Sequence, residues 1–262
     1  MQFYHIDELP RGWSVYPHIN QGYRVNLSIY QCFISIFNKN NNEVWMIWTD
    51  IFPCILFSYI YVHWLYSDSY QAMNSFYRIL ASGTYVAALT SRSFSCIYHI
   101  FNPISLQMNR SLINLDYIGI TSIIFGYPWV YANALHIKSC TDDRFIFYIS
   151  GLALCMIATT AYFTMAILNR TKNIQQTPII IFIVSIGTAT SSLIVLDHDI
   201  STEWKFHCML GTYCFLFGYI VFYNLHIPES LYKPYHPLLY SHVMWHNIVT
   251  MGQYLFLCTT YL

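Results

Sequence analysis

Seven long apolar segments constrain the fold of this chain more than any other feature. Each segment is long enough to cross a hydrocarbon layer of about 30 Å as a helix. Because backbone amide groups in lipid must be paired within the protein, such runs favour helices over the shorter alternating strands of a barrel. The segments lie near residues 46–66, 76–101, 115–136, 145–168, 177–196, 206–225 and 238–262. They predict an all-α membrane protein, a seven-transmembrane helix bundle.

The composition agrees with a membrane location. Only 9% of the residues are charged and 56% are hydrophobic, whereas about 25% are charged in a soluble domain. The net charge of zero gives no electrostatic reason to expect nucleic acid as a partner. We expect residues 46–262 to form the multi-pass transmembrane domain, in the plasma membrane or an endomembrane. Residues 1–45 form the amino-terminal region, in which Ile29–Phe37 is either a short interfacial helix or part of a disordered leader.

Basic residues indicate the orientation of the bundle. They gather in the amino-terminal region and in the loops after the second, fourth and sixth segments: Arg11, Arg24, Lys39, Arg110, Arg170, Lys172 and Lys233. The opposite loops are mainly acidic. Because cytosolic loops carry an excess of Lys and Arg, we expect a cytosolic amino terminus and an external carboxyl terminus.

Two histidines four residues apart lie near the start of the last segment. His242 and His246 would lie one above the other on a helix face, which suits either a metal site or two hydrogen-bonded core residues. The predicted orientation brings His99, from the end of the second segment, to the same depth. Ser95 lies one turn before His99, and Asp116 lies at the start of the third segment. Ionisable groups inside a membrane are expensive and are usually functional or paired.

This set of side chains indicates two alternatives. Three histidines are the ligands of an open catalytic zinc site, where the metal lowers the pKa of a water molecule to about 7 and makes hydroxide available to attack a carbonyl. Asp116 would orient or deprotonate that water, and Ser95 would hydrogen-bond the water or a tetrahedral oxyanion. The alternative is a polar network that ties three helices together. The residues alone leave both open.

Arg92 is a further charged residue inside an apolar segment, two turns before His99. We expect it to snorkel, to pair with an acidic group, or to bind a lipid headgroup or a fatty-acid carboxylate.

Several short strings in this sequence, taken together, carry a family resemblance. They are Gly22-Tyr23-Arg24, Cys32-x-x-Ser35-x-Phe37, Asn42-Glu43, Ile47-Trp48-Thr49, Ser93-Phe94-Ser95-Cys96-Ile97-Tyr98-His99, Leu115-Asp116-Tyr117-Ile118-Gly119-Ile120, His226-Ile227-Pro228-Glu229 and Ser241-His242-x-x-x-His246. In this order they resemble the progestin and adipoQ receptor family, from about Gly22 to the end of the chain.

The resemblance implies seven helices, a cytosolic amino terminus and a zinc ion held by His99, His242 and His246. It also implies that Ser95 and Asp116 occupy the other two positions of a motif shared with alkaline ceramidases. Members of the family are described either as hormone receptors or as ceramidase-like amide hydrolases. The implied partner is therefore a membrane lipid such as ceramide or a fatty acid, or a steroid or adipokine-like ligand. The alternative is a non-catalytic signalling receptor or scaffold with a structural zinc ion.

The sequence also departs from the pattern of the family it resembles. Val44, Met46 and Asp50 stand where Thr, Asn and His are usual, and Val243 replaces the Gln of an S-H-Q string. We expect none of these four residues to contact a presumed zinc ligand.

Overall fold

The structure is a computed structural model, and it describes residues 1–16, 18–123, 201–232 and 236–262 together with scattered positions between 129 and 153. These residues are mostly helical. The predicted segment at 177–196 lies wholly outside the described residues, and those at 115–136 and 145–168 lie partly outside them.

Long helices occupy four of the predicted segments. They are α2 (Val44–Leu65), α4 (Ser75–Phe101), α9 (Thr202–Phe217) with its continuation, the π-helix η4 (Gly218–Asn224), and α10 (Ser241–Cys258). The short helix α3 (Asp68–Ala72) lies between α2 and α4, and the 3-10 turn η5 (Pro237–Leu239) precedes α10. In these four segments, a helix is therefore present where the hydropathy pattern predicts one.

The third helix begins earlier than predicted. Helix α5 (Leu106–Ser122) includes a polar first half, whereas the hydropathy pattern predicts a segment at 115–136. The Ser105 hydroxyl accepts a hydrogen bond from the Met108 amide at 3.1 Å and caps the helix, because Ser satisfies free N–H groups at a helix start. The polar cap, and not the start of the apolar run, decides where this helix begins.

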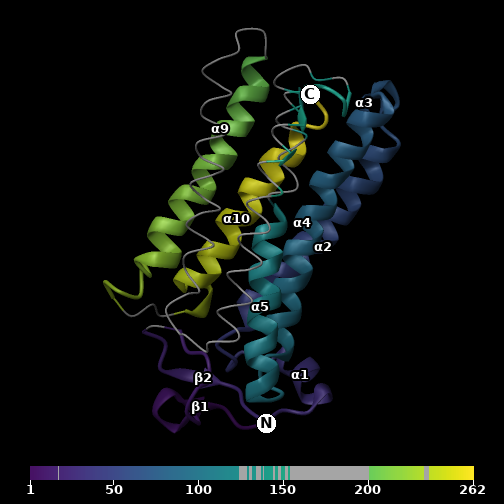
Figure 1. The fold of residues 1–262 in the computed structure, drawn as a ribbon. Helices are drawn as coiled ribbons and strands as arrows, with labels where there is room; N and C mark the ends of the chain where they lie inside the picture. The colour runs from purple at the N-terminus through teal and green to yellow at the C-terminus, as the bar shows by residue number, and fades with distance from the viewer. Residues whose placement is uncertain are drawn as a thin grey trace.

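The long helices lie side by side with their axes roughly parallel (Figure 1). Helix α4 packs against α2 and α5, and α10 packs against α9, α2 and η4. The amino terminus lies at one end of this assembly and the carboxyl terminus lies at the opposite end (Figure 1). The last turns of α4 and the first turns of α10 therefore come together at the end that carries the amino-terminal region.

Two of the described helices are both long and apolar enough to cross a membrane: α2 and the continuous stretch Thr202–Asn224. Helices α4 and α10 have sufficient length but are less apolar. The reason is visible in their sequences, since α4 carries Arg92 and His99 and α10 carries His242 and His246. The helices that hold the polar side chains have the weaker hydropathy signal.

The amino-terminal region folds against one end of the helices (Figure 1). Strands β1 (Tyr4–His5) and β2 (Gln21–Tyr23) pair antiparallel, and the 3-10 turn η1 (Ile6–Glu8) follows β1. Helix α1 (Ile29–Ser35) coincides with the predicted interfacial segment and begins with a capping box between Ser28 and Gln31. It exposes large apolar side chains while Cys32 and Ser35 are buried. This segment is therefore helical, with large apolar side chains on its exposed side.

Candidate metal centre

Three histidines gather where α4 and α10 meet. His99 and His246 are buried and His242 is half-buried, and one ring nitrogen of each lies within 4.8 Å of the other two. Their ring centroids are separated by 4.9 Å for His242–His246, 5.0 Å for His99–His246 and 5.5 Å for His99–His242. The structure therefore brings together the helical pair and the third histidine that the depth argument selected.

The Nδ1 atom of His99 faces a carboxylate and a hydroxyl group. Its Nδ1 lies 3.4 Å from Glu43 Oε1 and 3.4 Å from the Tyr16 hydroxyl. Its Nε2 is buried and has no hydrogen-bond partner among the described residues. A carboxylate at Nδ1 fixes the proton there and leaves Nε2 as a lone-pair donor, which is the usual arrangement of a metal-bound histidine. A buried orphaned nitrogen is otherwise costly.

His246 has the same kind of surroundings. Its Nδ1 lies 3.3 Å from Asp50 Oδ1 and 3.3 Å from the Thr49 hydroxyl. Both contacts come from α2, which packs against α10. Two of the three imidazoles thus turn Nδ1 toward a carboxylate, and this leaves Nε2 of each available to a metal ion.

Aromatic rings hold the third histidine. The His242 ring lies 5.1 Å from the Tyr16 ring and 6.4 Å from the Tyr223 ring. Tyr223 belongs to η4, and short π-helical stretches are frequent at functional sites because the extra residue per turn re-aims side chains. The start of α10 is fixed by Glu229, whose Oε1 accepts a hydrogen bond from the Ser241 amide at 2.6 Å. A carboxylate at a helix start satisfies a free N–H group and interacts favourably with the positive end of the helix dipole. Glu229 of the His-Ile-Pro-Glu string therefore fixes the first turn of α10, which carries His242.

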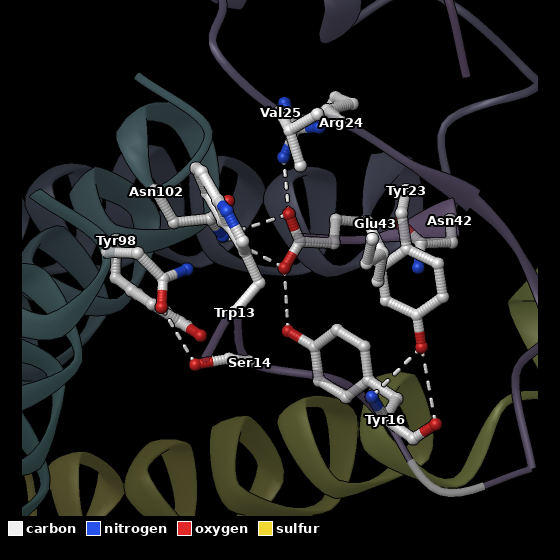
Figure 2. A pocket seen from close by; sticks show the side chains of 12 residues that line it. Trp13, Ser14, Tyr16, Tyr23, Arg24, Val25, Asn42, Glu43, Tyr98 and Asn102 are labelled. Atoms are coloured by element: carbon white, nitrogen blue, oxygen red, sulfur yellow. Dashed lines mark hydrogen bonds and ion pairs between the residues drawn. The ribbon is translucent and has the colours of Figure 1, made fainter. Parts of the chain in front are cut away.

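Glu43 is the centre of a polar pocket beside the histidines (Figure 2). Its carboxylate pairs with the Arg24 guanidinium, accepts from Asn102 Nδ2 at 2.9 Å at each oxygen, and accepts from the Tyr16 hydroxyl at 2.7 Å. Burial alone would raise the pKa of Glu43, but Arg24 and then His99 and Tyr16 lower it from 4.5 to about 2. Glu43 is therefore ionised at neutral pH.

Ser95 and Asp116 lie beside the histidine group. Ser95 is buried on α4, and its hydroxyl is within hydrogen-bonding reach of the half-buried Asp116 carboxylate on α5. Asp116 also interacts electrostatically with His99 and His246. These two side chains and the three histidines thus form one cluster, although Asp116 lies about three turns into α5 and not at its start.

One expectation about the unusual residues is wrong. Asp50 contacts the presumed ligand His246 directly and also pairs with Arg92, whose Nη1 lies 3.2 Å from Asp50 Oδ1. Of the three roles considered for Arg92, pairing with an acidic group is the one observed. The unusual Met46 and Val243 belong to one buried apolar cluster between α2 and α10.

The charges around the imidazoles suit a cation. The carboxylates of Glu43, Asp50 and Asp116 interact with the histidine rings. Two guanidinium groups, of Arg24 and Arg92, donate to the backbone carbonyls of His99 and His246. With neutral histidines, these described groups carry an excess of one negative charge. The nitrogens are close enough for side-chain rotation to arrange them around an ion with bond lengths of about 2 Å. The donor set, the orphaned Nε2 and the charge balance all fit a divalent metal such as zinc.

Sequence reasoning missed part of this site. Tyr16 carries no signal in the sequence, because it lies in an irregular segment far along the chain from the histidines. Glu43 and Arg24 lie in strings that carry the family resemblance, and that resemblance was the signal that could have identified them. Asp50 is marked in the sequence only by its departure from the family pattern, which usually has His there.

The fold and the site define an α-helical protein with a buried three-histidine group, which the amino-terminal region contacts through Tyr16. The sequence profile of the Haemolysin-III-related family matches residues 38–257. The chain therefore belongs to this family, which includes the progestin and adipoQ receptors. Its members are integral membrane proteins, and this chain is one as well.

Three relatives illustrate the range of the family. An uncharacterised protein of Schizosaccharomyces pombe is 28% identical over 261 residues, which cover 94% of this chain and 56% of that protein. An adiponectin receptor protein of Drosophila melanogaster is 28% identical over 130 residues, and a progestin and adipoQ receptor-like protein of Caenorhabditis elegans is 25% identical over 128 residues. Each of these two matches covers 48% of this chain and 29% of the relative. The chain thus spans about half the length of the first relative and less than a third of the other two.

Proposed function

We propose that this protein is a seven-transmembrane receptor of the progestin and adipoQ type with a zinc site in the inner leaflet, formed by His99, His242 and His246. One observation carries the proposal. His99 and His246 each turn Nδ1 toward a buried carboxylate, while ring nitrogens of all three histidines lie within 4.8 Å of one another. A polar network that only ties helices together has no need to leave His99 Nε2 without a partner among the residues that the structure describes.

The proposed topology has residues 1–45 in the cytosol and residues 46–262 in the membrane. The basic loops support this orientation, and the termini at opposite ends of the structure (Figure 1) agree with an odd number of spans. A glycosylation acceptor site added after Leu262 is expected to be modified in microsomes, whereas one added before Met1 is not. Modification of the amino-terminal tag alone would reverse the orientation and place the three histidines in the outer leaflet.

We propose hydrolysis of ceramide-like amides as the chemistry of this site. A bound zinc ion would supply Lewis acidity and an activated water. The Asp116 carboxylate would accept a proton at the site, and the Ser95 hydroxyl would orient that carboxylate or donate to the oxyanion of the substrate. The support is the shared cluster of Ser95, Asp116 and the histidines. The ligand would then be a membrane lipid, such as ceramide or a fatty acid, or a steroid or adipokine-like molecule that acts through this site.

A second candidate is a signalling receptor or scaffold in which zinc is structural. The observation that favours it is the extent of the surrounding network: His99 is completely buried, and Tyr16 joins the amino-terminal region to both His99 and His242. A metal held in this way would fasten the amino-terminal region to α4 and α10.

Metal analysis of the purified protein tests the site itself. We expect about one zinc ion per chain in the wild type and loss of that ion in the double variant His242→Ala/His246→Ala. His207→Ala is a matched control, because His207 is a half-buried residue of α9 whose Nδ1 contacts the Glu203 backbone carbonyl of its own helix. Zinc content unchanged in the double variant would refute the site.

Ceramide turnover in defined detergent separates the two candidates. The hydrolase proposal expects turnover that is lost in Asp116→Ala while zinc is retained. Full occupancy by zinc with no turnover in the wild type would favour the structural role. Activity that survives Asp116→Ala would remove the role assigned to that carboxylate.

A further inference from the structure

We propose that Asp50 is the positioning residue of the zinc ligand His246 and that Arg92 holds Asp50 in place. This inference rests on the zinc site proposed above and extends it to two residues inside the bundle. The family pattern that this chain resembles usually has His at the position of Asp50, so the arrangement belongs to this sequence.

Asp50 lies between the ligand and the cation. Its side chain is completely buried on α2, and Oδ1 lies 3.3 Å from His246 Nδ1 and 3.2 Å from Arg92 Nη1. Its other oxygen, Oδ2, has no hydrogen-bond partner among the described residues. A buried carboxylate at this depth would be very unfavourable if unpaired. Its position therefore depends on the guanidinium on one side and the imidazole on the other.

Arg92 is anchored to the same helix as the ligand. Its Nε donates to Gln253 Oε1 at 2.8 Å, and its Nη1 donates to the backbone carbonyl of His246 at 3.5 Å. Arg92 is only 4% exposed. The planar guanidinium thus joins Asp50 on α2 to two points on α10, which fixes the distance between the carboxylate and the His246 ring.

Asp50 and Glu43 act as a pair behind the ligands. Glu43 is the N-cap residue of α2, and Asp50 lies on that helix seven residues later, about two helical turns further along. Glu43 contacts His99 on α4, and Asp50 contacts His246 on α10. Helix α2 and its N-cap residue, neither of which supplies a zinc ligand, would therefore supply the carboxylates behind two of the three ligands. Such partners orient the ring and raise its basicity, and their removal typically weakens metal binding 10- to 100-fold.

A purely structural role for the Asp50–Arg92 ion pair predicts a different result. If Asp50 and Arg92 only fasten α2 to α4 and α10, their removal changes stability and leaves the metal affinity of the folded protein unaltered. Zinc affinity and the visible spectrum of bound Co²⁺ therefore distinguish the two roles, because both report on the ligand rings directly.

The experiment compares three variants of the full chain in detergent. Asp50→Asn removes the charge behind His246, and Asp50→Leu/Arg92→Met replaces the whole ion pair by apolar groups, which buried sites often tolerate without loss of fold. Asp7→Asn is the matched control, because it breaks an Asp–His contact of 3.1 Å on the exposed surface. Zinc affinity is measured by competition with a chelator, Co²⁺ spectra are recorded, and unfolding is followed on the metal-free protein.

We expect both Asp50 variants to bind zinc 10- to 100-fold more weakly than the wild type and to alter the Co²⁺ absorption bands, while Asp7→Asn changes neither. If Asp50→Asn fails to fold, the double variant decides, because it leaves no unpaired charge. A folded double variant with the affinity and spectrum of the wild type would overturn the inference while the zinc site stands. A wild-type protein that binds no zinc would instead overturn the proposed function, and this inference with it.

Discussion

Replacing Glu43 by Gln should destabilise the protein strongly at neutral pH. Gln has nearly the shape of Glu, so the main loss is the negative charge. The side chain of Arg24, which pairs with this charge, is only 1% exposed. Arg24 also donates to the Ser35 hydroxyl at 2.6 Å and to the His99 carbonyl at 2.7 Å, and neither neutral partner compensates the charge.

Two lines of reasoning give the magnitude. Removal of one partner of a buried ion pair typically costs about 3–5 kcal/mol, because the other charge is left buried and unpaired. Independently, the fall of the Glu43 pKa from 4.5 to about 2 corresponds to about 3 kcal/mol of folding free energy, at about 1.4 kcal/mol for each pH unit. We therefore expect Glu43→Gln to lower the free energy of unfolding by about 3 kcal/mol at pH 7.

The pH dependence has a definite sign. Because the pKa of Glu43 is lower in the folded state than in the unfolded state, the carboxylate stabilises the fold fully above about pH 5. This contribution is lost as the pH falls from about 4.5 toward 2, where the folded protein also takes up the proton. The difference in stability between the wild type and Glu43→Gln should therefore shrink over this range.

The assay is reversible unfolding of metal-free protein in mixed micelles between pH 3 and 7. Comparison of the two proteins at each pH removes the contribution of the other carboxylates. Glu203→Gln is the control, since Glu203 is exposed in the first turn of α9, and it should change stability by less than about 0.5 kcal/mol. Equal stability of Glu43→Gln and the wild type at pH 7, or a difference that stays constant with pH, would refute the reasoning.

Two further predictions concern the amino-terminal region. Tyr16→Phe keeps the ring beside His242 but removes the hydroxyl bonded to Glu43. Because a hydrogen bond to a charged group contributes about 1.5–3 kcal/mol, we expect the free energy of unfolding in urea or SDS titrations to fall by that amount while the zinc content is retained. A Tyr16→Phe variant as stable as the wild type would contradict this prediction. Gly22→Ala should destabilise the region by more than about 1 kcal/mol, because Gly22 has a φ of +90° and an added Cβ would lie 2.7 Å from the Asn40 carbonyl oxygen. Faster limited proteolysis between β2 and α1 would report this change, and unchanged cleavage would argue against it; Gly12→Ala is a poor control, since its φ is also positive.

The hydropathy pattern predicted the long helices well and their ends less well. Segments at 46–66 and 76–101 match α2 and α4 closely, because the apolar run and the helix end together. At α5 the run and the helix differ, since Ser105 starts the helix among polar residues that hydropathy does not count. Helix starts depend on side-chain bonds to free amides, and these follow a different pattern from burial.

The three histidines and their neighbours Ser95 and Asp116 could be grouped from the sequence, because depth along a membrane helix follows from residue number. Which groups stand behind the histidines could not be predicted. In the sequence, Glu43 is part of a family string and Asp50 is a departure from the family pattern, yet each lies within 3.4 Å of a histidine ring nitrogen. Lateral neighbours depend on how each helix is rotated about its axis, and hydropathy along α2 gives little information on that rotation.

The sequence by itself therefore determined the class of protein, the long helices at both ends of the chain and the common depth of His99, His242 and His246. Only the tertiary structure decided that Asp50 on α2 and Glu43 at its N-cap both face the histidines, that Arg92 pairs with Asp50, and that Tyr16 reaches the site from the amino-terminal region. The physical reason is that depth and hydropathy are properties of one segment at a time. Ion pairs and ring contacts instead join residues far apart in the sequence, such as Asp50 with His246 and Tyr16 with His242, and they form only when the packing of several helices fixes the rotation of each.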